Sequence, residues 1–145
     1  MQTSAEERED TVGCPVLIFS SDEDFVDHHR RTLLSLGFVP ITAATAEAAL
    51  AVLRLSVIAL VVVDEDEGLC ASREILRRAR EIQQHAPVLV VGQSADPESR
   101  HQALTLGAAE YLEHPVLRDD VVQAFFPHGS RVLLHAPAQR KCVKT

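Results

Sequence analysis

The chain has 145 residues and a formal net charge of −7, and 46% of its residues are hydrophobic. This length and composition are typical of one globular domain with a single core, and the negative charge disfavours direct binding to nucleic acid or to an anionic membrane surface. The longest apolar run covers residues 57–63, far short of the roughly 18 residues that cross a bilayer, so we expect a cytoplasmic protein with no membrane partner.

The distribution of apolar residues divides the chain into three segments. Residues 1–12 carry mostly polar and charged side chains, which is typical of a disordered lead-in. Residues 13–127 contain the regular apolar patterns and form the predicted domain. Residues 128–145 follow a break in these patterns and are interpreted as a C-terminal extension or linker, in which "RVLLHA" is a candidate for an extra strand.

The first half of the predicted domain alternates strands with helices. "PVLIF" (15–19) is typical of a buried strand, and Ser21 is the predicted N-cap of a helix that carries acids in its first turn and stops at Gly37. "FVPIT" (38–42) is predicted to be an edge strand, because proline cannot donate a hydrogen bond to an inner neighbour. Thr45 is the predicted cap of the next helix, which is rich in alanine.

The second half continues this alternation. "VIALVVV" (57–63) has the unbroken β-branched pattern of a central strand that is buried on both faces of a parallel sheet. The remaining predicted elements are a helix over 72–84, a strand over 87–91, a helix from Asp96 to Gly107, a strand over 110–114, and a short helix with an apolar stripe at Leu117, Val121, Val122 and Phe125. Five strands separated by helices predict an α/β fold with a doubly wound parallel sheet.

The candidate site lies in the loops after the strands, because the functional crevice of an open parallel sheet is found beyond the carboxyl ends of its strands. Four such loops are predicted to converge. Their notable residues are Ser20, Ser21 and Asp22, the acids Asp64 to Glu67, Gly92 to Ser94, and His114 with Pro115.

Residues 14–126 resemble the receiver domain of bacterial two-component response regulators. The resemblance rests on the Asp that ends the third strand, on "TAEAAL" in the second helix, on "ALTLGAAEYL" from the fourth helix into the fifth strand, and on the X-Pro pair that follows. It implies a flavodoxin-like receiver fold with strand order 2-1-3-4-5 and a role in signal transduction or a phosphorelay. It also implies a phosphoryl acceptor at Asp64 and a rotating switch aromatic at Tyr111.

Several pocket positions depart from the pattern of the family. In the family, two acids after the first strand hold Mg²⁺, a hydroxyl residue after the fourth strand contacts the phosphoryl group, and a lysine precedes the proline. The corresponding residues here are Ser20, Ser21, Gly92 and His114. Phosphoryl transfer to a carboxylate brings two anions together and depends on a metal and on cations, and the loss of one such partner typically costs on the order of 10²–10³ in rate.

These departures predict a degenerate pocket, in which Asp64 is a weak or inactive acceptor and no metal or other cofactor is bound. We therefore expect a pseudo-receiver that is not an enzyme and that acts through protein–protein interaction without phosphorylation. The resemblance implies another signalling protein, or an output domain of a longer chain, as the partner. It also implies a docking or homodimer face made by the fourth helix, the fifth strand and the fifth helix.

Two phosphate chemistries stay open as alternatives. The first is an Mg²⁺-dependent phosphoacceptor that a histidine kinase phosphorylates on Asp64 and that dephosphorylates itself, with metal ligands from Asp64, the backbone carbonyl of Asp66, and Asp22. The second is a phosphatase of the haloacid dehalogenase type, in which Asp64 is the nucleophile and Asp66 the general acid or base. Nucleotide or flavin binding is disfavoured, because the loop after the first strand lacks the glycines that let backbone N–H groups approach a phosphate.

The histidines of the predicted domain give a weaker signal. His28 and His29 are neighbours on a helix and point about 100° apart, unlike the i, i+4 pair of a metal site, so we expect both on the solvated surface. His114 is interpreted as a polar loop residue. Its alternative role is a pH-sensitive pairing with Asp64, since a neighbouring carboxylate would raise the pKa of the imidazole.

Overall fold

The computed structural model describes residues 13–93 and 96–125. The expected lead-in over 1–12 and the expected extension over 128–145 therefore lie outside the described residues. The elements in chain order are β1 (Pro15–Phe19), α2 (Glu23–Ser35), β2 (Val39–Ala43), α3 (Ala46–Leu55), β3 (Leu60–Asp64), the 3₁₀ turn η1 (Glu65–Glu67), α4 (Leu69–Ile82), β4 (Val88–Gly92), α5 (Pro97–Thr105), β5 (Glu110–Glu113) and α6 (Arg118–Phe125).

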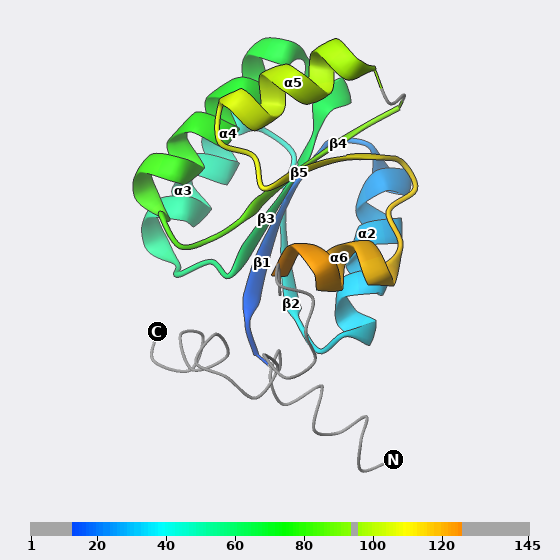
Figure 1. Cartoon of the computed structure of the whole chain (residues 1–145). Helices are drawn as coiled ribbons and strands as arrows, with labels where there is room; N and C mark the ends of the chain where they lie inside the picture. The colour runs from blue at the N-terminus through cyan, green and yellow to red at the C-terminus, as the bar shows by residue number, and fades with distance from the viewer. Residues whose placement is uncertain (1–12, 94–95, 126–145) are drawn as a thin grey trace.

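The five strands form one parallel sheet in the order β2-β1-β3-β4-β5, which confirms the predicted fold class and strand order. Helices α2 and α6 cover one face of the sheet, and α3, α4 and α5 cover the other (Figure 1). Strand β2, which contains Pro40, lies at one edge, as its sequence predicted. None of the helices in the described ranges combines the length and the apolar character needed to cross a membrane.

Each face of the sheet has its own hydrophobic core. Side chains alternate along β3, so that Val61 and Val63 pack under α3, α4 and α5, whereas Leu60 and Val62 pack under α2 and α6. All five residues of this strand are buried. Side chains on both faces of this central strand pack against apolar helices rather than water, which explains its unbroken β-branched sequence.

The start of α2 differs from the prediction, because Asp22 rather than Ser21 is its N-cap. The Asp22 carboxylate accepts a hydrogen bond from the Asp24 backbone N–H at 3.0 Å. Ser21 instead donates its hydroxyl to Glu67 at 2.7 Å. A carboxylate at this position also interacts favourably with the positive end of the helix dipole.

Two further helices differ from the prediction at their ends. Helix α4 begins at Leu69, earlier than residue 72, because Gly68 acts as its N-cap with a φ of 111° that favours glycine. The predicted stripe on the last helix is also wrong at Leu117, whose side chain is 61% exposed. Val116 and Val121 are the buried residues here, since the helix begins only at Arg118.

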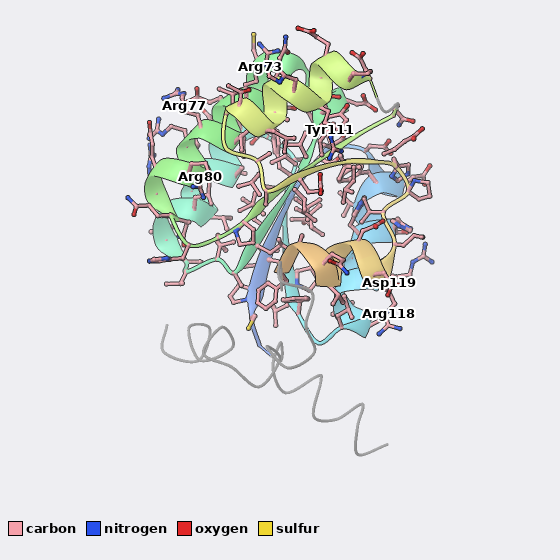
Figure 2. All side chains as sticks on the ribbon, viewed as in Figure 1. Arg73, Arg77, Arg80, Tyr111, Arg118 and Asp119 are labelled. Atoms are coloured by element: carbon pink, nitrogen blue, oxygen red, sulfur yellow. The ribbon has the colours of Figure 1, made fainter. Side chains whose placement is uncertain are left out.

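The arginines of α4 lie along its outer side, where Figure 2 labels Arg73, Arg77 and Arg80. Arg77 pairs with Glu74 at 2.5 Å and with Glu81 at 3.4 Å on the same helix. Such exposed pairs each stabilise a helix by only a few tenths of a kcal/mol. This side of α4 is therefore a solvated surface.

Gln83 joins the end of α4 to the connection between α3 and β3. Its side-chain amide donates to the carbonyl oxygens of Leu53 at 2.7 Å and Ser56 at 2.6 Å, and its side-chain oxygen accepts from the Ile58 N–H at 3.1 Å. Because the Ile58 N–H is bonded to a side chain rather than to a strand, β3 begins at Leu60 and not at residue 57 as predicted.

We predict that Gln83→Ala lowers the free energy of unfolding by about 2 kcal/mol, because three backbone groups lose their partners in a partly buried site. Gln84→Ala is the matched control, since the neighbouring Gln84 side chain is exposed. Urea denaturation of the two variants tests this. Equal stability of both would show that the Gln83 side chain does not hold this connection.

Candidate functional site

The predicted site residues meet at the carboxyl end of the sheet. Asp64 is the last residue of β3, Ser20 directly follows β1, Gly92 ends β4, and His114 directly follows β5. The register of the parallel strands brings these ends to one level, since Asp64 pairs with Val91, the residue before Gly92. The convergence of the loops is therefore confirmed.

Asp64 is buried at this edge, with 4% of its surface exposed. One carboxylate oxygen accepts from the Ser20 hydroxyl at 2.6 Å, and the other accepts from the backbone N–H of Asp66 at 2.9 Å. The Ser72 hydroxyl donates to the backbone carbonyl of Asp64 at 2.9 Å. Both carboxylate oxygens are thus occupied by neutral donors.

Burial raises the pKa of the Asp64 carboxyl above its ordinary value of 3.8. The hydrogen bonds from Ser20 and from the Asp66 N–H oppose this increase, and the negative charges of Asp66 and Glu67 add to it. The charged form of Asp64 is therefore held less favourably than that of an exposed aspartate.

The two serines that occupy the positions of the family's acidic pair are used in local hydrogen bonds. The Ser20 hydroxyl donates to Asp64 and accepts from the Asp22 N–H at 3.0 Å. The hydroxyl and the backbone N–H of Ser21 both donate to one oxygen of Glu67, at 2.7 and 2.6 Å. These bonds join the loop after β1 to Asp64 and to the loop after β3. Carboxylates at positions 20 and 21 could not donate the two hydrogen bonds that the hydroxyls make.

The residues present do not fit the Mg²⁺ ion that the resemblance implies. The Asp22 carboxylate caps α2, and a neutral hydroxyl is a poorer ligand for Mg²⁺ than a carboxylate. Within residues 13–93 and 96–125, no three His, Cys, Asp or Glu side chains form a group that could hold a metal ion. This includes the side chains of Asp22, Asp64 and Asp66.

Tyr111 points into the space above Gly92, on the face of the sheet that α5 covers (Figure 2). It is 3% exposed, and its hydroxyl donates to Glu65 at 2.5 Å. Burial and the adjacent Glu65 carboxylate raise the pKa of the Tyr111 phenol above its ordinary value. The phenol therefore stays protonated and continues to act as a donor to Glu65.

Glycine at position 92 leaves free the space that the Tyr111 and Glu65 side chains occupy. A Cβ atom built there would lie 2.6 Å from the Glu65 carboxylate oxygen and would also collide with the Tyr111 hydroxyl oxygen. Gly92 is not among the glycines with positive φ, so its backbone conformation alone would accept a side chain. The hydroxyl residue of the family and this arrangement of Tyr111 and Glu65 are therefore mutually exclusive.

His114 does not pair with Asp64, which corrects one alternative drawn from the sequence. Its ring stacks on that of Phe25 from α2, with centroids 5.7 Å apart and an interplanar angle of 16°. The hydrogen bonds that Asp64 accepts come from Ser20 and Asp66 instead. The position that carries a lysine in the family is therefore directed to α2.

The expectation that His28 and His29 are solvated is also wrong. His29 is 1% exposed, and His28 is partly buried and donates from Nε2 to the Val116 carbonyl at 2.6 Å. A signal for His29 was present in the sequence. It lies between Phe25 and Leu33 at i, i+4 spacing, and this spacing places all three on the buried side of α2.

Comparison with known proteins agrees with this architecture. No family model and no curated protein matches the chain. A response regulator from Thermotoga maritima is 24% identical, with a TM-score of 0.69 over 92% of this chain and 100% of that one. A CheY-like receiver domain protein from Methanospirillum hungatei is 22% identical, with a TM-score of 0.71 over 89% and 98%.

A third solved structure is a response regulator from Burkholderia pseudomallei that contains a phosphorylated aspartic acid and a calcium ion. It is 21% identical, with a TM-score of 0.70 over 90% of this chain and 72% of that one. Likeness at this level of identity shows the fold. The chain has the fold of response regulator receiver domains, as its sequence predicted.

We predict that Asp64→Asn becomes more stable relative to the unmodified protein as pH rises from about 4 to 7. Because the folded pKa is raised, the unfolded chain releases this proton first, and the protein loses stability as pH rises from 3.8 through the raised value. An amide does not titrate, so it avoids this loss, which amounts to about 1.4 kcal/mol for each unit of pKa difference.

Urea denaturation across this pH range measures the difference in unfolding free energy between the two proteins. Asp119→Asn makes the same change at an exposed position and is the control, and it should not gain stability over the unmodified protein as pH rises. If the unfolding free energy of Asp64→Asn instead falls relative to that of the unmodified protein as pH rises, the fold stabilises the Asp64 carboxylate and the prediction is wrong.

We predict that Gly92→Ala lowers the free energy of unfolding by about 1–3 kcal/mol, because the new methyl group collides with Tyr111 and Glu65. In a Tyr111→Leu background the clash with the ring is gone and Glu65 loses the hydrogen bond that holds it over Gly92, so the cost of the same change should decrease. A double-mutant cycle measured by urea denaturation gives the coupling energy. Equal costs in both backgrounds would rule out a clash with Tyr111 as the cause.

Proposed function

We propose that this chain is a receiver-like signal-transduction module that acts in the cytoplasm by binding another protein and does not require phosphorylation. The fold supports a role of the two-component type, and Asp64 stands at the end of the third strand, where the family carries its acceptor. The single observation that carries the proposal is the contact between Tyr111 and Glu65 over Gly92.

The contact supports the proposal because the resemblance assigns this space to the hydroxyl that follows the phosphoryl group and draws the aromatic residue inward. Here Tyr111 is already buried without such a hydroxyl, and a carboxylate is its partner. A phosphoryl group on Asp64 would add negative charge beside Glu65, Asp66 and Glu67. It would meet repulsion and would have no residue at position 92 through which to act on Tyr111.

The donors around Asp64 support the same conclusion. Catalysis of phosphoryl transfer needs positive charge where the anions meet, and Ser20 and the Asp66 N–H supply only neutral hydrogen bonds. His114, at the position of the family's lysine, is stacked on Phe25. The chain is accordingly proposed to be a binding module, without a cofactor and without catalytic turnover.

The proposed docking face consists of α5, β5 and α6, which are the elements that the resemblance implies. Leu104 in α5 is 38% exposed and Leu117, which directly precedes α6, is 61% exposed, so apolar side chains of these segments are available for contact. The occupant is proposed to be another signalling protein or an output domain of a longer chain. A second copy of the chain is the remaining candidate.

An Mg²⁺-dependent phosphoacceptor is the second candidate function, favoured by the position of Asp64 and by the phosphorylated aspartic acid in the Burkholderia pseudomallei structure. We predict no mass increase when the full chain is incubated with acetyl phosphate and Mg²⁺ and measured by intact mass spectrometry. A receiver known to accept phosphate is the positive control. Addition of one phosphate, lost in Asp64→Ala, would establish the phosphoacceptor instead.

The phosphatase alternative makes a separate prediction, namely turnover of a generic phosphate ester that depends on Asp64 and Asp66. The binding module and the phosphoacceptor both predict no such turnover. Measuring ester hydrolysis in the same preparation therefore separates this reaction from the other two.

A further inference from the structure

Three histidines from two parts of the chain meet beside Phe25, on the face of the sheet that α2 and α6 cover. His28 and His29 belong to α2, and His114 follows β5. Their ring centroids are 5.0 Å apart for His28 and His29, 5.7 Å for His28 and His114, and 5.8 Å for His29 and His114. We refer to His28, His29 and His114 as the histidine cluster.

The hydrogen bonds of the histidine cluster define where a proton would add. The Phe25 carbonyl lies 2.8 Å from His29 Nδ1 and can only accept, so Nδ1 carries the hydrogen and Nε2 of the neutral ring is a bare acceptor. His29 Nε2 is buried and has no hydrogen-bond partner. The same is true of His114 Nδ1. Two imidazole nitrogens are thus enclosed without a polar neighbour that satisfies them.

Among residues 13–93 and 96–125, no carboxylate contributes to the pKa of His29. The titratable groups of these ranges that act on it are His28 from its own helix and His114 from the connection after β5, and both disfavour its protonation. Burial is the largest effect and lowers the pKa of His29 to about 4 from its ordinary 6.5. Exposure of the ring to water would remove most of this penalty.

The histidine cluster also joins α2 to the segment 114–117, which leads into α6. His28 donates to the carbonyl of Val116, and the Val116 side chain is fully buried between the sheet and these helices. Helix α6 buries Val121, and Phe125 at its end packs edge-on against Phe38 with ring centroids 5.0 Å apart. The segment that the histidine cluster holds leads into α6 and therefore provides a further attachment of this helix to the domain.

We propose that the histidine cluster is a proton-operated switch, in which acidification below about pH 6.5 opens the contact between α2 and the segment 114–117 and loosens α6. The open form exposes the His29 ring to water, where it takes up a proton at its ordinary pH, whereas burial in the closed form disfavours the protonated ring. The proposal does not rest on the proposed function, because neither Asp64 nor Tyr111 takes part in it, but it bears on that function through α6, which belongs to the proposed docking face.

The linkage has a defined sign and size. For His29, the closed form is fully favoured above pH 6.5, and its advantage falls until the pH reaches the folded value near 4. Within this range, each unit of acidification multiplies the opening equilibrium constant of α6 by roughly ten for a single histidine. We expect the opening constant to rise by about tenfold from pH 6 to pH 5.

Native-state hydrogen exchange on the full chain, corrected for the intrinsic effect of pH on exchange rates, tests the proposal. The α6 amides, including that of Val121, should lose about tenfold protection from pH 6 to pH 5, while those of α5 should not. His29→Leu should abolish this loss, and His101→Gln, which changes an exposed histidine on α5, should leave it intact.

A second variant, His114→Gln, serves if His29→Leu fails to fold, and it should reduce the loss of α6 protection. The proposal is overturned if α6 protection does not change with pH, or if it falls equally in the unmodified protein and in the folded cluster variants. It is also overturned if α5 loses protection in parallel with α6, since that would indicate general acid unfolding.

Discussion

The structure depends most on how the Asp64 carboxylate is accommodated at the end of β3. Every residue of this strand is buried, so the chain must satisfy a carboxylate at the end of its most apolar element. It does so with the Ser20 hydroxyl and the Asp66 N–H, which are neutral donors. The serine that removes the family's metal ligand at this position is therefore also the residue that satisfies the buried acid.

The acidic residues around Asp64 also accept hydrogen bonds from neutral donors. Glu67 is bonded to Ser21 and Glu65 to Tyr111, so each acts as an acceptor that holds a neighbouring loop or strand. In a pocket built around a cation, these carboxylates would be oriented toward the ion. Here their hydrogen bonds connect the loop after β1 with the loop after β3, and the loop after β3 with β5.

The sequence predicted the fold well because the fold follows from local patterns. Three local features predicted elements that the structure contains. They are the β-branched run around Val61 for a buried strand, Pro40 for an edge strand, and Thr45 for a helix cap. The position of Asp64 could be predicted for the same reason, since it depends only on where a strand ends. The cap of α2 was missed because Ser21 is drawn away by Glu67, a residue distant in sequence.

Features that depend on side-chain direction across elements could not be predicted. The partnership of Glu65 and Tyr111 joins residues 46 positions apart and requires the space over Gly92, which no local pattern reveals. The burial of His29 is a different case. Its spacing from Phe25 and Leu33 indicated the inner side of α2, and the polarity of histidine outweighed that indication.

The crowding over Gly92 constrains how this sequence could change over time. The Cβ atom of a threonine introduced at that position would collide with the side chains of Tyr111 and Glu65, so the substitution would destabilise the domain. A side chain at position 92 therefore requires Tyr111 or Glu65 to move or to be replaced, and either change gives up a contact that the domain now has. Positions 65, 92 and 111 are accordingly epistatic, since the effect of a substitution at one of them depends on the residues at the other two.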